Sequence, residues 1–269
     1  MPQPDISTAN DSDDETFHHP SWPERWTHPE FMVSHDERRA HWIQQPWWKD
    51  RDRTSVNFIG NFKWPWGFMI YRTVYTPESD EVWTSCLDKI TRYIHCGIDH
   101  VDGERYSGQD PFPETIIKET YKNVILDDRE RWDGASWDQI RADFNVYLKS
   151  LGVEVGSDVP RFTACLVIDE KCLRSIMRAF DNPLDQRGVS KVGMRSRMGF
   201  VGMIDPTYME GNSCCVNLYQ GFMRVPISSL YELAARQLPC FSMDEICPSV
   251  SGPGKVPVHN GSGGYEDDE

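Results

Sequence analysis

The chain has 269 residues, of which 39% are hydrophobic and 12% aromatic, enough apolar side chain for an ordinary buried core. Its 28 basic and 42 acidic side chains give a formal charge of −14, which argues against broad attraction to nucleic acid or to an anionic membrane surface. No apolar run approaches the ~18 residues at which a membrane span becomes a candidate. The composition predicts a folded domain whose partners are proteins or small molecules.

The two ends of the chain are polar. Residues 1–20 are acidic and lack the basic and apolar regions of a secretory signal, whereas residues 241–269 are rich in Gly, Pro and Ser before an acidic end. We expect both ends to be disordered, because neither holds enough apolar surface to offset chain entropy. The missing signal predicts a cytoplasmic protein, with a nuclear location left open. In that compartment the 8 cysteines are expected to be free thiols.

Tryptophan is concentrated in one segment, because residues 21–66 hold 7 of the 10 tryptophans on a stretch broken by prolines. We expect residues 21–65 to form an irregular arm over the domain, with a short helix near residues 37–43. One interpretation is that the rings anchor the arm by packing onto the sheet. The other is an aromatic-lined small-molecule pocket or partner groove.

Residues 66–240 are expected to form a single α+β domain. Apolar residues alternate through residues 68–74, which is typical of a strand. Thr76 and Pro77, followed by acids, then indicate a helix start, and an apolar stripe continues this helix to residue 94.

This junction also carries a resemblance. Residues 66–83 read WGFMIYRTVYTPESDEVW, and they resemble a large group of filamentous ascomycete proteins that share the pattern W-G-[FY]-x-I-Y-R-T-x-Y-x-P-E-S-D-x-x-W. Residues 221–226, leading into 230–233, more loosely resemble the segment with which such proteins often close. The resemblance implies membership over roughly residues 60–240 and a fungal source. It brings no assigned activity, but it implies an association with secondary-metabolite gene clusters.

The remaining elements follow from periodicity and capping patterns. Ser136 with Gln139, and Ser229 with Glu232, each form the pattern of a capping box at a helix start. The expected elements are a short helix at 114–125, a helix at 136–151, a strand at 162–168, a helix at 170–180, strands at 200–204 and 222–227, and a helix from 229 to before Pro239. This order predicts an antiparallel or mixed sheet with helices packed on one face and ferredoxin-like elements.

Common catalytic and nucleotide-binding motifs are absent from the sequence, including the P-loop, GxGxxG, GxSxG and HExxH patterns. Residues 95–104 offer two histidines, a cysteine and several acids, but their spacing fits no standard zinc template. The interpretation we prefer is a solvated helix end, with His95 stabilised at the negative end of the helix dipole. We therefore predict no metal and no cofactor.

Two arginines are the sharpest candidates for a ligand site. Arg72 shares a predicted strand face with apolar residues, and Arg224 does the same in the later strand. If these faces converge, two guanidinium groups could bind a carboxylate or phosphate. The alternative is that both arginines pair with acids such as Asp169 or Asp205, or extend to a sheet edge, because a buried guanidinium needs a partner.

A locally basic loop runs from Asp181 to Arg197 in this acidic chain. It would be a mobile lid over an anionic ligand or, as we prefer, a solvated insertion. Its cations are Arg187, Lys191, Arg195 and Arg197.

Two functions from different classes remain. The first is an intracellular accessory or interaction protein, and we favour it because no nucleophile and base pair stands out in the sequence. The alternative is a cofactor-free tailoring enzyme, a cyclase or isomerase, with an arginine-lined pocket and a carboxylate or histidine as general acid–base.

Overall fold

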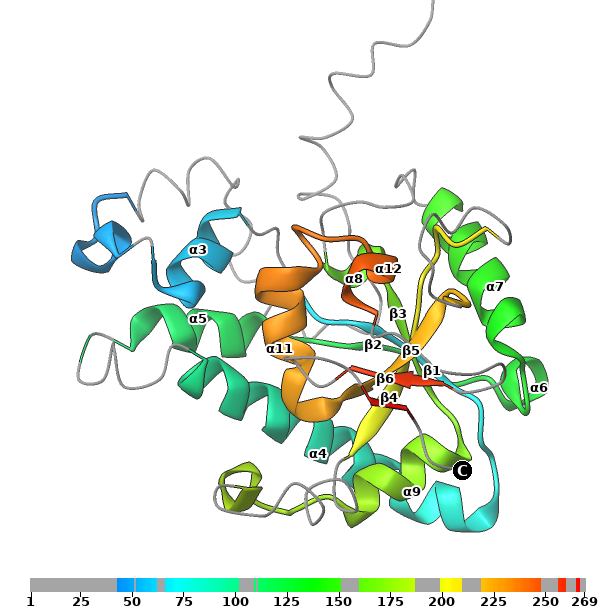
Figure 1. Ribbon diagram of the computed structural model, residues 1–269. Coiled ribbons are helices and arrows are strands. Elements are labelled where there is room, and N and C mark those ends of the chain that lie inside the picture. The colour runs from blue at the N-terminus through cyan, green and yellow to red at the C-terminus, as the bar shows by residue number, and fades with distance from the viewer. Residues whose placement is uncertain are drawn as a thin grey trace, which may run out of the picture.

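The computed structural model describes residues 43–50, 52–61, 66–101, 109, 111–150, 160–186, 199–209, 219–247, 256–259 and 265–266. Among these residues, seven strands form one mixed sheet in the order β2-β1-β3-β4-β5-β6-β7 (Figure 1). The strands are β1 (Met69–Arg72), β2 (Val124–Leu126), β3 (Cys165–Ile168), β4 (Phe200–Ile204), β5 (Phe222–Pro226), β6 (Pro257–Val258) and β7 (Tyr265–Glu266). Helices pack on this sheet, so the expected α+β class with a mixed sheet is confirmed.

One half of the sheet is parallel, with β1 between β2 and β3. The chain moves from β1 to β2 on one side, and then crosses back to β3 on the other side of β1. Because crossovers between parallel strands are right-handed, this reversal sends the two sets of helices to opposite faces. The first set is α4 (Pro77–His100) and α5 (Phe112–Thr120); the second is α6 (Arg129–Trp132), α7 (Trp137–Ser150) and the short α8 (Pro160–Thr163).

Each face of the sheet has its own hydrophobic core. On the larger face, Ile70 and Leu166 pack beneath α4, α9 (Glu170–Arg178) and α11 (Leu230–Glu232). On the other face, Tyr71 and Val167 pack against apolar residues of α7. Figure 1 shows α6 and α7 on one side of the sheet and α4, α5 and α11 on the other.

The expectation of helices on one face therefore describes the larger layer only. The strand order also differs from ferredoxin-like elements, because β2, β1 and β3 run parallel. The difference arises within residues 114–125, where one short helix was expected. Helix α5 ends at Thr120, and residues 124–126 form β2 instead. A strand of three residues is too short for periodicity to separate it from a preceding helix.

Several predicted helix starts are confirmed. The Thr76 side chain accepts a hydrogen bond from the backbone N–H of Ser79, at 3.2 Å, at the start of α4. Ser136 and Gln139 form the expected box, because Ser136 N–H donates to Gln139 Oε1 at 2.7 Å and Gln139 N–H donates to Ser136 Oγ at 3.3 Å. The expected box at Ser229 is wrong, since the Ser229 side chain makes no capping hydrogen bond. The chain there enters through the 3₁₀ turn η6 (Ile227–Ser229) and leaves α11 through the π-helical turn η7 (Leu233–Gln237).

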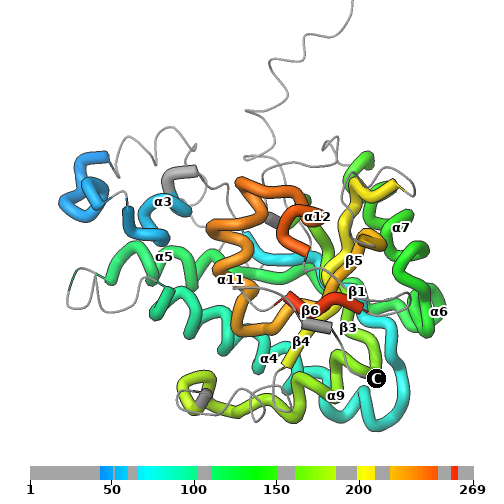
Figure 2. Tube along the Cα trace, in the orientation of Figure 1, coloured from blue at the N-terminus to red at the C-terminus, as the bar shows by residue number. Residues whose placement is uncertain are grey.

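Part of the expected C-terminal tail belongs to the fold. Helix α12 (Met243–Ile246) begins with a capping box and buries Met243 against the larger core. Strand β6 pairs with β5, and the His259 N–H donates to the Arg224 carbonyl oxygen at 2.8 Å. Figure 2 shows this C-terminal strand in the middle of the fold. The expectation of disorder across 241–269 is therefore wrong for residues 241–247 and 256–259, because they bury apolar side chains and complete the edge of β5.

The described part of the tryptophan-rich arm is partly helical. It contains the 3₁₀ turn η3 (Pro46–Lys49) and helix α3 (Thr54–Asn61). Trp47 and Trp48 are buried and contact each other edge to face, with ring centroids 5.9 Å apart. These two rings behave as packing anchors. The helix expected near residue 37, and the whole of 1–20, lie outside the described residues.

Trp66 and Gly67 fix the entry into β1. Trp66 is fully buried, and its indole N–H donates to the Ile117 carbonyl oxygen at 2.7 Å. Gly67 has φ +137°, and a β carbon there would lie 2.2 Å from the Lys122 carbonyl oxygen. Only glycine fits this position, because it tolerates both the backbone conformation and the close approach.

Candidate functional site

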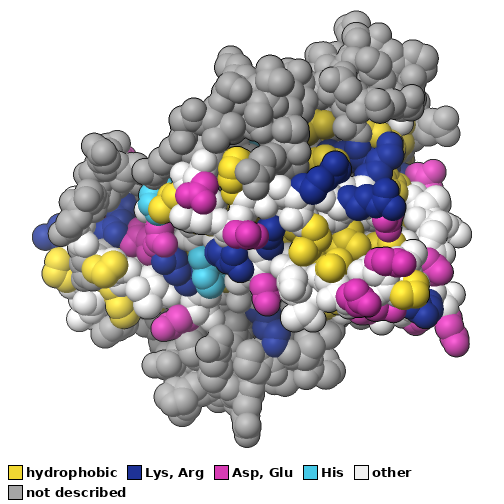
Figure 3. Space-filling model, turned by 90° about the horizontal axis from the view of Figure 1, so that it is seen from below, with side chains coloured by type: hydrophobic (Ala, Val, Ile, Leu, Met, Phe, Trp, Pro, Cys, Tyr) yellow, Lys and Arg dark blue, Asp and Glu magenta, His cyan; other side chains and the backbone are white. Residues whose placement is uncertain are grey.

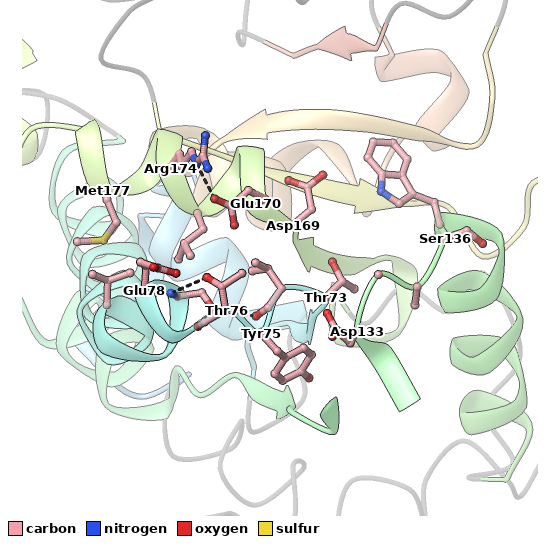
Figure 4. A pocket seen from close by; sticks show the side chains of 17 residues that line it. Thr73, Tyr75, Thr76, Glu78, Asp133, Ser136, Asp169, Glu170, Arg174 and Met177 are labelled. Carbon is pink, nitrogen blue, oxygen red and sulfur yellow. Dashed lines mark hydrogen bonds and ion pairs between the residues drawn. The ribbon is translucent and has the colours of Figure 1, made fainter. Parts of the chain in front are cut away.

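An open cleft of about 1100 Å³ lies at the carboxyl ends of β1 and β3. Its sides are residues 73–76, which lead from β1 into α4, the helix α9 that follows β3, and residues 133–137, which lead into α7. Figure 4 shows side chains from these three segments around the opening. This volume of about 1100 Å³ lies slightly above the ~300–1,000 Å³ typical of small-molecule sites.

The strand order accounts for the position of the cleft. Neighbouring parallel strands β1 and β2 send their outgoing connections to opposite faces of the sheet, because α4 packs on the larger core and α7 on the other. The two connections separate above the carboxyl edge, and ligands of open α/β sheets bind at such a switch point. The cleft therefore follows from the topology of the parallel half.

The lining of the cleft combines acids with apolar side chains. Among the described residues, four carboxylates and one guanidinium line it, together a formal charge of −3, and the guanidinium of Arg174 is paired with Glu170 at 2.5 Å. Seen from below, where α9 and the start of α4 lie in Figure 1, hydrophobic side chains form a strip with basic side chains along one border and acidic ones along the other (Figure 3). The carboxylates are Glu78, Asp133, Asp169 and Glu170, and the apolar lining includes Val74, Val82, Ala135, Trp137, Leu173 and Met177.

Two helices begin at the cleft, and both are capped by their own side chains. Thr76 caps α4, where Pro77 has no N–H to offer. Asp169 caps α9 by accepting from the Cys172 N–H at 2.7 Å, and a further acid lies in the first turn of each helix. A helix start attracts an anion through free N–H groups and its dipole. Here the chain's own oxygens occupy that role, so the cleft disfavours phosphate and carboxylate ligands.

Arg72 lies behind the cleft and joins three segments. Its Nε donates to the Val74 carbonyl oxygen at 2.9 Å, and its terminal nitrogens donate to Ser79 Oγ at 3.2 Å and Asp127 at 3.3 Å. It also forms an ion pair with Asp80. Only 5% of Arg72 is exposed. Its donors are engaged in shaping the β1–α4 connection, so it is a structural residue of the cleft wall.

Aromatic rings complete the surroundings of this guanidinium. Arg72 Cζ lies 4.6 Å from the ring centroid of Tyr75 and 4.7 Å from that of Trp83. Burial and the neighbouring Asp127 carboxylate raise the pKa of the Tyr75 hydroxyl. The planar group held between two rings is typical of arginine and would not be reproduced by lysine.

The two predicted arginines point to opposite faces of the sheet. Arg72 pairs with Ile168 in register and joins the α4 face, whereas Arg224 lies between Met223 and Val225, which belong to that same α4-side core. Strand alternation therefore directs Arg224 to the α7 face, where its Cζ lies 4.7 Å from the Phe200 ring centroid. The hypothesis of a joint anion site is wrong, because the sheet separates the two guanidinium groups.

The predicted acids are not the arginines' partners as we had proposed. Asp169 is the α9 cap described above and lines the cleft. Asp205 is buried and accepts from the Tyr219 hydroxyl at 2.9 Å and from Thr207 N–H at 2.7 Å. Asp205 therefore orders the turn after β4. Of the four predicted site residues, Asp169 alone is among the described residues that line the cleft.

The cluster at the end of α4 does not assemble a metal site within the described residues. His95 is half-buried beside the ring of Tyr121, with centroids 5.9 Å apart. Burial and the Lys118 ammonium lower the His95 pKa below its ordinary value. Residues 102–104 lie outside the described residues.

Two other sequence features can be placed only in part. Cys165 and Cys172 are free thiols, and burial raises the pKa of each. This agrees with a structural role for these two residues. The four cations of the 181–197 loop lie outside the described residues.

Most of the cleft lining could not be identified from the sequence alone. Thr73, Glu78 and Trp137 line it, although the sequence assigns them only to a strand, a helix start and a helix, and Asp133 lines it from a segment between two expected helices. The signal that could have located them is the position of each directly after a strand or before a helix. That signal required β2, which was not predicted.

No family model matches this chain, and no curated protein or solved structure shows significant similarity to it. Among the described residues, no helix combines the length and apolar composition needed to cross a membrane.

Proposed function

We propose that this chain is a fungal accessory protein that binds a small molecule in the cleft at the carboxyl ends of β1 and β3. The single observation that carries the proposal is the open cleft at the switch point of the parallel strands, where ligands bind in sheets of this kind. The resemblance of residues 66–83 to ascomycete proteins associated with secondary-metabolite clusters suggests a ligand from such a pathway. A cytoplasmic location remains our expectation.

The position of the arginines favours binding over the enzymatic alternative. A cyclase or isomerase with an arginine-lined pocket would need a free guanidinium in the cleft, and Arg72 and Arg224 are not among its described lining residues. Arg174 is there, but it is paired with Glu170. Acid–base catalysis in this cleft would therefore have to use carboxylates alone.

The proposal is tested by filling the cleft with a larger side chain and comparing the amount of ligand that the variant and the wild type bind. Val82 is half-buried on α4 and lines the cleft, whereas Val146 of α7 is 67% exposed and lies away from it. Native mass spectrometry of protein purified from a filamentous fungus should show a stoichiometric small molecule in the wild type and in Val146→Trp, but not in Val82→Trp. Circular dichroism confirms that both variants are folded. A ligand retained by Val82→Trp, or no ligand in any of the three proteins, would count against the proposal.

A further inference from the structure

The chemistry of the cleft restricts the class of ligand beyond the proposed function, on which this inference rests. Glu78, Asp133 and Asp169 line the cleft and have no ion pair with a described residue. The guanidinium of Arg174, the one that the described lining contains, is paired with Glu170. Three carboxylates around one cleft give its described lining a negative potential, which favours a cation over an anion.

The two helix starts at the cleft are poor sites for phosphate, the ligand that commonly binds at such positions. At the carboxyl edge of a parallel sheet, free N–H groups at helix starts commonly hold phosphate. Here Pro77 lacks an N–H, and the N–H groups of Ser79 and Cys172 donate to Thr76 and Asp169. An anion entering the cleft would meet oxygen atoms at both helices.

The walls require an apolar component in the ligand. Val82, Leu173 and Met177 come from α4 and α9, and Trp137 comes from the start of α7. The Trp137 ring contacts the Phe222 ring edge to face. A fixed indole beside carboxylates is suited to an alkylated ammonium, which binds aromatic faces and loses little hydration on burial.

We propose that the ligand of this cleft is an organic cation, an alkylated or quaternary ammonium attached to a hydrocarbon body. The carboxylates neutralise its charge, and the apolar wall with Trp137 covers the hydrocarbon. Inorganic cations and polar anions are disfavoured, because the former leave the apolar wall exposed to water and the latter are repelled.

Three probes of nearly equal shape test the proposal by calorimetric titration of the full chain at low salt. They are choline, its uncharged isostere 3,3-dimethylbutan-1-ol, and the anion 3,3-dimethylbutanoate. We expect choline to bind about tenfold or more tightly than the alcohol, a preference of about 1.4 kcal/mol, and the anion to bind most weakly. Salt at 0.5 M should reduce the preference, because it screens the carboxylates.

A charge variant gives the matched control. Asp169→Asn keeps the helix cap, since Asn caps as well as Asp, and removes one charge. It should weaken choline severalfold and leave the alcohol unchanged. Asp88→Asn removes an exposed α4 charge outside the cleft lining and should change neither probe.

The outcomes separate the two proposals. Equal binding of choline and the alcohol, both abolished by Val82→Trp, would keep the cleft as a ligand site and overturn the cationic class. Tighter binding of the anion would do the same. Choline binding that survives Val82→Trp would place the cation outside the cleft, and no choline binding at millimolar concentrations would reject the cationic class; either result overturns this inference. The proposed function fails separately, when native mass spectrometry finds no ligand or finds one that Val82→Trp retains.

Discussion

Helix α4 begins at the carboxyl edge of β1 and ends 24 residues later against α5, and its two ends use ionisable side chains differently. At the first end, Arg72 joins the strand, the helix start and the loop after β2 through donors that are all buried. At the last end, Lys118 and Asp99 form a partly exposed ion pair beside half-buried His95. Both ends looked chemically rich in the sequence.

The difference between the ends lies in the sheet beneath them. The first end lies where the connections that leave the parallel strands β1 and β2 go to opposite faces of the sheet. The segments diverge at this edge and leave a cleft between them. The last end packs on another helix, where side chains fill the space. The ionisable residues at the first end belong to a candidate site because the strand topology places them beside a cleft. The number of ionisable residues in a stretch of sequence does not predict such a site.

The largest expected effect is at the first end. Arg72→Met should lower the free energy of unfolding by about 2–3 kcal/mol, because the buried Ser79 hydroxyl loses the donor from Arg72 and the Val74 carbonyl keeps only the Ser79 hydroxyl as a side-chain donor. The loss stays below the ~3–5 kcal/mol of a fully buried pair, since Asp80 and Asp127 are 47% and 38% exposed and regain water. Urea unfolding measures the change.

Arg174→Met provides the control for this prediction. Its side chain is 71% exposed and pairs with a half-exposed Glu170, so the expected change is within about 0.5 kcal/mol. Equal losses in the two variants would show that Arg72 does not hold the β1–α4 connection as its contacts indicate.

The second effect concerns the helix cap beside the cleft. Thr76→Ala should cost about 1 kcal/mol, because the Ser79 N–H loses its acceptor. Thr84→Ala, at an exposed position inside the same helix, should be neutral or slightly stabilising, since alanine has the higher helix propensity. Thermal unfolding followed at 222 nm compares the two. An equal loss of stability in Thr76→Ala and Thr84→Ala would show that the Thr76 cap does not stabilise the helix.

Local chemistry allowed much of this fold to be predicted. The Thr76 cap, the Ser136 box, β4 and the two faces of β1 all follow from neighbouring residues and were predicted correctly. The glycine of the W-G pattern also has a local reason, since the φ of +137° at Gly67 is one that residues with a β carbon rarely adopt. These features depend on contacts within a few residues or on one backbone angle.

The cleft and the separation of the arginines depended on pairings between distant segments. Strand β2 has three residues, and its parallel pairing with β1 fixes the direction of the sheet. Without this pairing, the sequence shows which neighbours share a face with Arg72 or with Arg224 in each strand. It does not show whether the two arginines lie on the same face of the sheet. Without β2, Asp133 and Trp137 also could not be assigned to the cleft, because the crossover from β2 to β3 sets their place there.

The smallest effect belongs to the last end of α4 and depends on pH. Burial lowers the pKa of His95 in the folded protein, so the unfolded chain takes up this proton first as the pH falls. Stability that is present above the ordinary histidine pKa of ~6.5 is therefore lost as the pH drops toward the folded pKa. His95→Gln should lose less stability than the wild type between pH 7.5 and 5.5, as measured by urea unfolding.

The charge next to His95 identifies the cause of that shift. Lys118→Met removes a positive charge that lowers the His95 pKa, so an NMR titration should show the pKa rising toward its ordinary value, with unfolding free energy changed by no more than about 0.5 kcal/mol. His100→Gln, at an exposed site in the last turn of α4, should keep the wild-type pH dependence. A pH dependence that survives in His95→Gln but disappears in His100→Gln would assign the proton to the exposed ring. The burial of His95 would then not explain the pH dependence of stability at this end of α4.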